Sequence, residues 1–412
     1  MIRTLLLLGA TGDLATRFLL PALGVLHAAG RLPAGFRVVG AARTQLDDEG
    51  MRRLAGDDLP ADMLAYRSVD LSDAASLAAA LDGTSEPVAA YLALPPGVFT
   101  TTIESLGEVG LQLGSRIIVE KPFGDDVESA HALNVLLEHA CSDAYRVDHV
   151  LGMATVRNLV AMRRENPVLE RLWNSDNVEQ VEILWEETLA LEGRAGYYDN
   201  TGALKDVLQS HLLQLFALVG TEPPVPGDAD LHERKLDVLR SCRVARSRRA
   251  RYTSGTLADG REVRAYTEED GVDPARCTET FAEVTLELET PRWAGTPFVV
   301  RTGKALAARR KLVLLRLRGG GELEFGIDGP RDVVARLAGV ADLLELRAPA
   351  PAERLPAYAH VLLDVLGGAN ALSVGAVGAE EAWRVVAPVV AAWEAGAIPI
   401  EEYAAGSSGP TS

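Results

Sequence analysis

The segment 146–153 (RVDHVLGM) places a carboxylate, Asp148, next to an imidazole, His149. Carboxylates and imidazoles are the usual partners in general acid–base catalysis near neutral pH. After this pair the segment becomes apolar at Val150 and Met153, where a phosphate-binding site would carry charge. The pair therefore predicts proton transfer, and the apolar residues leave the identity of the substrate open.

Besides His149, one other of the seven histidines, His211, has polar neighbours in the sequence that could form a ligand site with it. It belongs to an expected amphipathic helix over 204–219, whose exposed turn also carries Asp206. A loop rich in Gly, Asp and Asn leads into this helix, and Glu187 ends the expected strand before that loop. A few convergent polar groups at one end of an element are typical of a site that orients a small ligand such as a sugar. We interpret the remaining histidines as structural.

The first turn of the chain has the residues of a dinucleotide site. The sequence GATGDL follows an expected strand (4–8) and opens an expected helix, so its backbone N–H groups can bind a pyrophosphate. After the second strand (36–40), Arg43 and Thr44 stand where an NAD site would place an acidic residue, which favours NADP. The expected contacts are Gly9, Thr11, Gly12, Asp13, Leu14, Arg43 and Thr44. The alternative is a glycine turn that serves only helix packing.

Short strands alternate with helical stretches in the first third of the chain, which indicates βαβ units and a doubly wound parallel sheet. Lys121 follows the expected strand 116–119, so it would lie at the carboxyl edge of this sheet, beside the nicotinamide, with Pro122 in a cis or an ordinary trans turn. Longer strands follow at 178–187, 280–289, 298–301 and 311–318, and helices at 204–219, 352–366 and 380–393. We expect a Rossmann-type α/β domain (1–147) and an α+β domain (148–412) with a large, mainly antiparallel sheet backed by helices. The tail from Ala404 is expected to be loose.

The charge of the chain argues against nucleic acid and anionic membranes as partners. Its 41 basic and 58 acidic residues give a net charge of −17, which repels both. The basic run 243–251 is interpreted as a solvated strand edge. Cys141, Cys242 and Cys277 show neither disulfide nor metal-site spacing. We therefore expect a cytoplasmic protein without a metal that acts on a small molecule.

Several segments, in order along nearly the whole chain, resemble the glucose-6-phosphate dehydrogenase family, although the chain is shorter than typical members. They are GATGDLA (9–15), AART (41–44), YLALPP (91–96), EKPFG (120–124), RVDH (146–149), GRAGYYD (193–199), KDVLQSHLLQ (205–214), RTGKAL (301–306) and EEAWRVVAPVVAAW (380–393).

The resemblance implies a homodimeric enzyme that oxidises C1 of a hexopyranose to a lactone with NADP. His211 matches the family's base, and Asp148 matches the carboxylate that orients it. The positions that match contacts to sugar hydroxyls are Lys121, Glu187, Asp206 and Lys304, and those that match phosphate contacts are His149 and Arg309. On the cofactor side the resemblance adds Pro95, Glu120 and Lys121.

The chain departs from the family directly after Asp148-His149. The family's usual continuation is Tyr-Leu-Gly-Lys-Glu, with the Tyr and the Lys on the phosphate, whereas this chain has Val150, Met153 and Ala154 at the changed places. If the segment opens a helix, His149, Val150 and Met153 form one patch. The two lost bonds would cost roughly 2–4 kcal/mol, or about 30- to 1,000-fold in affinity for the phosphate. Phe18 also stands where the family usually carries a Lys that reaches the active site.

Three hypotheses follow from these departures. The chain is a true glucose-6-phosphate dehydrogenase of the pentose phosphate pathway with rearranged phosphate contacts, or it oxidises C1 of another sugar, or it is an inactive NADP-binding regulatory homologue. Because Asp148 and His211 are both present, the third hypothesis is the weakest. Because the changes gather on the phosphate side, the sequence favours a changed sugar.

Overall fold

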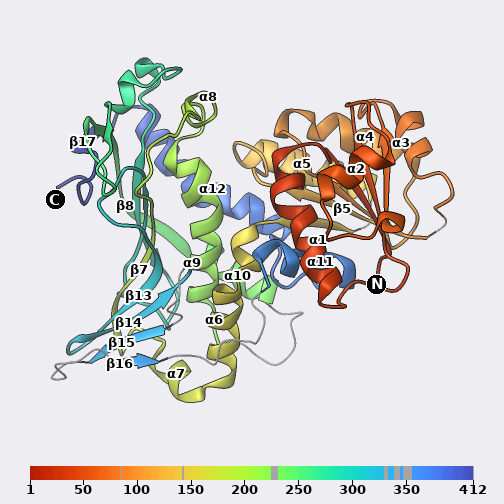
Figure 1. The fold of residues 1–412 in the computed structure, drawn as a ribbon. Helices are drawn as coiled ribbons and strands as arrows, with labels where there is room; N and C mark the ends of the chain where they lie inside the picture. The colour runs from red at the N-terminus through yellow and green to blue at the C-terminus, as the bar shows by residue number, and fades with distance from the viewer. Residues whose placement is uncertain are drawn as a thin grey trace. The chain divides into compact units, whose positions relative to one another are not determined.

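The computed structural model describes residues 1–84, 86–141, 143–223, 231–328, 333–337, 344–346 and 355–411. The chain forms two compact units (Figure 1). The first comprises Met1–Ala154 with Ala352–Glu380, and the second comprises Thr155–Pro351 with Glu381–Ser412. The expected boundary at residue 147 divides the chain into two consecutive parts. In the structure, residues 352–380 belong to the first unit as well.

The first unit is built around a parallel sheet in the order β3-β2-β1-β4-β5-β6. The strand order reverses between β1 and β4, which is where nucleotides bind in folds of this type. The strands are β1 (Thr4–Leu8), β2 (Arg37–Ala42), β3 (Leu64–Ser68), β4 (Val88–Leu92), β5 (Arg116–Glu120) and β6 (Ala144–Val147). The longer helices are α1 (Leu20–Ala28), α2 (Asp48–Ala55), α3 (Ala74–Ala80), α4 (Phe99–Val109), α5 (Val127–Ala140) and α11 (Ala357–Gly367).

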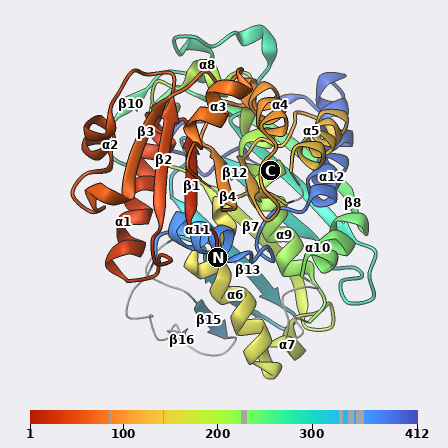
Figure 2. The ribbon, with the colours of Figure 1, turned by 90° about the vertical axis from the view of Figure 1, so that its right-hand side faces the viewer.

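Helices cover both faces of this sheet, so its central strands are apolar throughout. All four leucines of β1 are fully buried, and Leu5 and Leu7 pack in one cluster with α1 and α11. Figure 2 shows α1 and α11 together, whereas α3, α4 and α5 form a separate layer. The helix α5 begins at a capping box, in which Asp126 and Ser129 satisfy the free N–H groups of the first turn.

The second unit contains a nine-stranded sheet in the order β16-β15-β14-β13-β7-β12-β11-β8-β17. Most neighbours are antiparallel, but β7 pairs with β12 and β8 pairs with β17 in parallel. The strands are β7 (Val178–Glu186), β8 (Cys242–Thr253), β11 (Phe281–Leu288), β12 (Phe298–Gly303), β13 (Arg310–Leu317), β14 (Gly321–Gly326), β15 (Val333–Leu337), β16 (Leu344–Leu346) and β17 (Ile400–Ala404). A separate pair of short strands is formed by β9 (Gly255–Thr256) and β10 (Glu262–Val263).

A layer of helices lies against the middle of this sheet. The π-helix η5 (Leu204–Leu212) continues as α9 (Leu213–Gly220), and η5 contacts β7, β11 and β12. The remaining helices are α6 (Ala154–Glu165), α7 (Pro167–Leu172), α8 (Ala195–Tyr198), α10 (Leu231–Arg240) and α12 (Ala376–Glu394). Aromatic side chains fill the core, where the ring of Phe298 lies 5.2 Å from that of Phe216 and 5.0 Å from that of Trp293.

The expected fold class is confirmed, and several local expectations differ from the structure. The basic run 243–251 belongs to β8, where β17 pairs only with residues from Arg249 onward. Among the described strands, Arg243–Arg248 pair with β11 alone, so most of the run lies at a strand edge as expected. The tail is not loose, because the backbone N–H of Gly406 bonds the carbonyl of Ala305 and Ser407 forms a bridge with Leu306. The strand β3 was not expected at all. The expected helix over 352–366 begins at Ala357, and residues 352–354 lie outside the described residues.

The segment after Asp148 does not open a continuous helix. Residues His149–Gly152 form a short 3-10 turn, η4, and Met153 has an extended backbone before α6 begins. The turn packs against α11, where a side chain at Gly152 would meet the carbonyl of Ala357 at 2.5 Å. Val150 is consequently fully buried, and the expected single patch of His149, Val150 and Met153 on one helix is wrong.

Candidate functional site

The glycine turn after β1 has the conformation that a phosphate-binding turn requires. Gly9 has φ +85°, and a Cβ atom at this position would lie 2.3 Å from the carbonyl oxygen of Ala93. The N–H of Gly9 bonds Ala41, and the N–H of Gly12 bonds the carbonyl of Gly9. The next residues, Ala15–Leu19, form a π-helix, η1, before α1 begins. Only glycine fits the first position of the turn, because the backbone of the neighbouring strand end approaches so closely.

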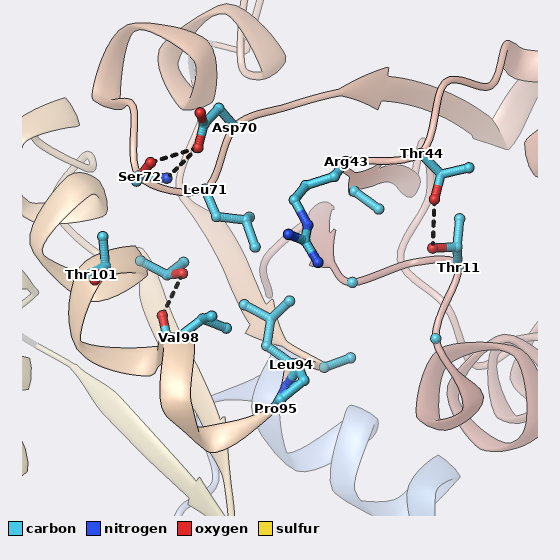
Figure 3. A pocket seen from close by; sticks show the side chains of 15 residues that line it. Thr11, Arg43, Thr44, Asp70, Leu71, Ser72, Leu94, Pro95, Val98 and Thr101 are labelled. Carbon is cyan, nitrogen blue, oxygen red and sulfur yellow. Dashed lines mark hydrogen bonds between the residues drawn. The ribbon is translucent and has the colours of Figure 1, made fainter.

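A cavity of about 480 Å³ opens at this turn, within the first unit (Figure 3). Most of the expected cofactor residues line it, namely Gly9, Thr11, Gly12, Arg43, Thr44 and Pro95. Figure 3 shows the Arg43 side chain inside the group of lining residues, with Thr11 and Thr44 3.5 Å apart through their hydroxyl oxygens. Asp13 and Leu14 do not line the cavity: Asp13 is exposed and Leu14 packs against the core.

Two further polar residues of this cavity were missed because β3 was not expected. Asp70 and Ser72 follow β3, and the Asp70 carboxylate accepts the hydroxyl of Ser72 at 2.6 Å and its backbone N–H at 2.9 Å. These bonds, with a contribution from the Arg43 charge, lower the pKa of Asp70. An ionised carboxylate therefore lies near the Arg43 guanidinium, which we expect to bind a 2′-phosphate. The negative charge of Asp70 offsets part of the positive charge of Arg43.

At the end of β5, the Glu120 carboxyl group is buried among two tyrosines. The Tyr91 hydroxyl donates a hydrogen bond of 2.5 Å to Glu120, and Tyr358 of α11 also bonds it. Burial, with a smaller contribution from Asp148, raises the pKa of Glu120 to about 7. Its side chain is therefore held inside the first unit. The next residue, Lys121, is half-buried, and the Lys121–Pro122 peptide bond is cis.

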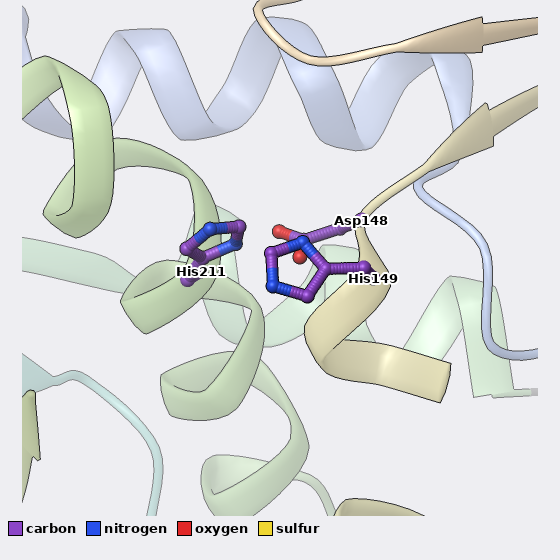
Figure 4. A group of neighbouring side chains, drawn as sticks. All are labelled: Asp148, His149 and His211. Carbon is purple, nitrogen blue, oxygen red and sulfur yellow. The ribbon is translucent and has the colours of Figure 1, made fainter. Parts of the chain in front are cut away.

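Asp148 and His149 lie directly after β6 (Figure 4). The buried Asp148 carboxylate caps η4 by accepting the N–H of Val150 at 3.1 Å. The His149 ring stacks on Tyr358, with 5.9 Å between ring centres and 17° between planes. Tyr358 also contacts Phe18 at 5.7 Å. The predicted phosphate ligand His149 thus stacks on Tyr358, which also contacts Phe18, the residue at the position of the family's Lys.

In the second unit, η5 carries His211, which Figure 4 shows projecting from its helix. The side chain is buried, so the expected exposed turn is wrong for His211. Its ring lies 5.6 Å from that of Trp185 on β7. Single π-helical turns are rare and frequently lie at functional sites. Their extra residue cannot be read from hydrophobic periodicity, so the sequence predicted an ordinary helix here.

A buried carboxylate fixes the start of η5. Glu279 accepts the N–H of Leu204 at 2.8 Å, and its carbonyl accepts the N–H of Ala203 at 3.1 Å. Gly202 has φ +68° and gives room to this carboxyl group, since a Cβ there would lie 2.5 Å from its oxygen. Burial raises the pKa of Glu279 to about 7. Sequence analysis missed Glu279, because no spacing links it to the helix.

The expected sugar-binding residues of the second unit meet at one end of the sheet. Glu187 follows β7, and its carboxylate lies 2.8 Å from the Lys304 ammonium group and 3.3 Å from that of Lys311. Burial alone would raise the pKa of Glu187, but the two lysines outweigh it and lower the value to about 2. Lys304 also lies over the ring of Tyr198, at 5.1 Å.

The other two expected substrate residues of this unit are more exposed. Asp206, on the first turn of η5, accepts a long hydrogen bond of 3.4 Å from the Tyr197 hydroxyl. Arg309 is largely exposed and forms an ion pair with Asp328. The first unit thus carries Lys121, Asp148 and His149, and the second carries the remaining expected catalytic and substrate residues. Lys311, Tyr197 and Trp185 are polar or aromatic neighbours that sequence analysis did not identify.

A Rossmann-type dinucleotide unit joined to a large sheet with a charged, polar cluster defines the class of two-domain nucleotide-dependent dehydrogenases. Two family models match the chain: "Glucose-6-phosphate dehydrogenase, NAD binding domain" at residues 6–158, and "Glucose-6-phosphate dehydrogenase, C-terminal domain" at residues 160–327 and 341–412. The chain belongs to the glucose-6-phosphate dehydrogenase family.

Individual relatives agree with this assignment. A glucose-6-phosphate 1-dehydrogenase of Aggregatibacter actinomycetemcomitans is 33% identical over 465 aligned positions, which cover 99% of this chain and 94% of the relative. A second, from Mycobacterium bovis, is 35% identical, with 99% and 91% covered. A solved glucose-6-phosphate dehydrogenase in complex with glucose 6-phosphate superposes with a TM-score of 0.89 at 27% identity, covering 99% and 96%.

The family assignment confirms the expected kind of enzyme, an NADP-dependent oxidoreductase of carbohydrate metabolism with a Rossmann-type cofactor domain. Within the part of the chain that the structure describes, no helix is both long and apolar enough to cross a membrane.

Proposed function

We propose that the chain oxidises the C1 hydroxyl group of glucose 6-phosphate to a lactone, with NADP as the hydride acceptor. The observation that carries the proposal is the ion pair of Glu187 with Lys304, next to the strands β7 and β12 that the helix of His211 contacts. Asp206 lies on the same helix, and ionised groups of both signs can orient several sugar hydroxyls. The similarity of nearly the whole chain to relatives named glucose-6-phosphate 1-dehydrogenase supports the same substrate.

Each expected residue has a role in this reaction. His211 removes the proton from the C1 hydroxyl while the hydride leaves C1, and Asp148 orients the imidazole and stabilises its cationic form, a contribution of about 10²–10⁴-fold in rate. Glu187, Asp206, Lys304 and Lys121 hold the sugar hydroxyls. His149 and Arg309 hold the phosphate.

On the cofactor side, NADP would supply the position that accepts the hydride. The residues of the first cavity fit this cofactor, because Gly9 leaves room for a pyrophosphate and Arg43 offers a cation at the ribose end. We propose that Thr44 and Thr11 complete the contacts to the 2′-phosphate, with Pro95 and Glu120 bounding the nicotinamide side. A cytoplasmic homodimer remains our expectation for the assembled enzyme.

A sugar other than glucose 6-phosphate is the second candidate. It is favoured by Val150, Met153 and Phe18, which replace polar phosphate-side residues of the family. The burial of Val150 beneath α11 weakens this argument, since a fully buried side chain does not line a pocket.

Steady-state formation of NADPH over a panel of free and phosphorylated sugars tests the proposal. We expect the highest kcat/KM with glucose 6-phosphate, and the highest value with an unphosphorylated sugar would support the second candidate. His211→Ala should abolish turnover while leaving NADP affinity nearly unchanged. Substantial residual turnover in this variant would refute the assignment of the base, and NADP binding without turnover of any sugar would indicate a regulatory homologue.

A further inference from the structure

Lys311 is a largely buried cation that neither the sequence motifs nor the family resemblance assigns to the site. It lies on β13 directly opposite Trp185 of β7, and directly opposed residues in a sheet point to the same face. Its ammonium group lies 3.9 Å from the centre of the Trp185 ring, and that ring is 5.6 Å from the ring of His211. Lys311 therefore belongs to the face of the sheet on which the predicted base stands.

Strand alternation separates Lys311 from its neighbour Arg310. Arg310 lies opposite Glu186 and bonds its carboxylate at 2.5 and 3.0 Å. Successive residues of a strand point to opposite faces, so Arg310 occupies the other side of the sheet. Arg309, by contrast, is close enough to Lys311 for its charge to lower the pKa of the Lys311 ammonium group.

Two ammonium groups meet one carboxylate at this end of the sheet. Lys304 and Lys311 share the carboxylate of Glu187, and Arg309 is paired with Asp328. The Lys311 side chain is only 10% exposed, and burial of a charge is costly unless its interactions compensate. Burial accordingly lowers the pKa of Lys311, against the opposing effect of Glu187. A largely buried cation that shares its carboxylate with a second lysine, beside sugar-binding residues, is well suited to an anionic group of a ligand.

We propose that Lys311, together with Arg309, binds the anionic substituent of the substrate and so makes the enzyme selective for an anionic sugar. This inference rests on the proposed C1 oxidation and adds a specificity residue to it. Lys311 would add a phosphate contact from the second unit. In the first unit, the positions of the family's Tyr and Lys hold Val150 and Met153, which offer no such contact.

The test compares Lys311→Met with the unaltered enzyme on glucose 6-phosphate and on glucose. Methionine retains much of the apolar stem and removes the charge, while Glu187 keeps Lys304 as its partner. We expect the KM for glucose 6-phosphate to rise about 10- to 100-fold, as for loss of one charge-assisted bond. The loss of kcat/KM for glucose should be much smaller, because that sugar loses only the effect of Lys311 on Glu187. Lys311→Arg should restore most of the affinity for glucose 6-phosphate.

Arg310→Met is the matched control, because it removes the neighbouring charge on the other face and leaves Glu186 with Arg301. It should change neither KM. Equal losses of kcat/KM for both sugars in Lys311→Met, or no loss for either, would overturn the inference.

A direct binding measurement separates this inference from the proposed function. If the unaltered enzyme oxidises no sugar, calorimetric titration with glucose 6-phosphate and with glucose still tests Lys311. Preferential binding of glucose 6-phosphate that disappears in Lys311→Met would support the role of Lys311 although the proposed function fails. Absence of any such preference in the unaltered chain would overturn both.

Discussion

Replacement of the buried Glu120 by glutamine should make the stability of the first unit less dependent on pH. The carboxyl group lies at the end of β5, is 8% exposed, and bonds the hydroxyl groups of Tyr91 and Tyr358. Glutamine keeps the volume and one carbonyl oxygen for the Tyr91 hydroxyl, and it removes the ionisation. The substitution therefore isolates the cost of a buried negative charge.

The size and sign follow from the pKa. Burial raises it to about 7 in the fold, whereas a glutamate in an unfolded chain has a pKa of about 4.3. At about 1.4 kcal/mol for each pKa unit, the difference is roughly 3 to 4 kcal/mol. The folded state binds the proton more tightly, so this stability is fully present below about pH 4 and is lost as the pH rises to about 7. Glu120→Gln should match the unaltered chain below about pH 4, exceed its stability by about 1 kcal/mol at pH 5, and exceed it by roughly 3 to 4 kcal/mol at pH 8.

Hydrogen exchange of the amides in β4 and β5, measured in urea at pH 5 to 8, reports the first unit. All five tryptophans lie in the second unit, so their fluorescence provides an internal control that should not change. Glu104→Gln, at an exposed position of α4, is the matched variant. A difference between Glu120→Gln and the unaltered chain that is constant from pH 5 to pH 8 would refute the reasoning.

Two further predictions concern one residue in each unit. Arg43→Ala should weaken NADP binding about 10- to 100-fold, because charge-assisted contacts are lost, and should leave NAD binding nearly unchanged. A fluorescence titration with each cofactor measures both affinities. Equal losses for the two cofactors would contradict the assignment of Arg43. Gly202→Ala should lower the free energy of unfolding of the second unit by about 1–3 kcal/mol in urea, followed by tryptophan fluorescence, because φ is +68° and the new Cβ meets Glu279. Gly193→Ala has φ +76° but open space around it, so an equal loss there would show that the contact with Glu279 contributes nothing.

Local sequence patterns predicted the nucleotide half of the molecule well. The strand at 4–8 and the helix at 127–140 have the bounds expected for them, since an unbroken apolar run and a capped amphipathic run each carry a clear period. The strand β3 was missed because its burial pattern is mixed, with Arg67 and Ser68 exposed at its end. Asp70 and Ser72, which line the cofactor cavity, were missed for the same reason, because they directly follow this strand.

The substrate side was predicted less completely, because its neighbours are far apart in the chain. Glu187 and Lys304 were expected from matching motifs, whereas Lys311 entered the cluster only through the pairing of β13 with β7. Glu279 likewise reaches the start of η5 from 75 residues away. Strand register, which fixes such partners, depends on packing across the whole sheet.

By itself, the sequence determined the Rossmann-type order, the family, and the residue types available for proton transfer and phosphate binding, because short motifs encode local turns and chemical groups. Only the tertiary structure decided that Val150 is buried under α11, that His211 lies on a π-helical turn, and that Glu187 joins two lysines. The reason is physical: burial and the pairing of charges depend on which distant segments pack together, and one-dimensional spacing does not contain that information.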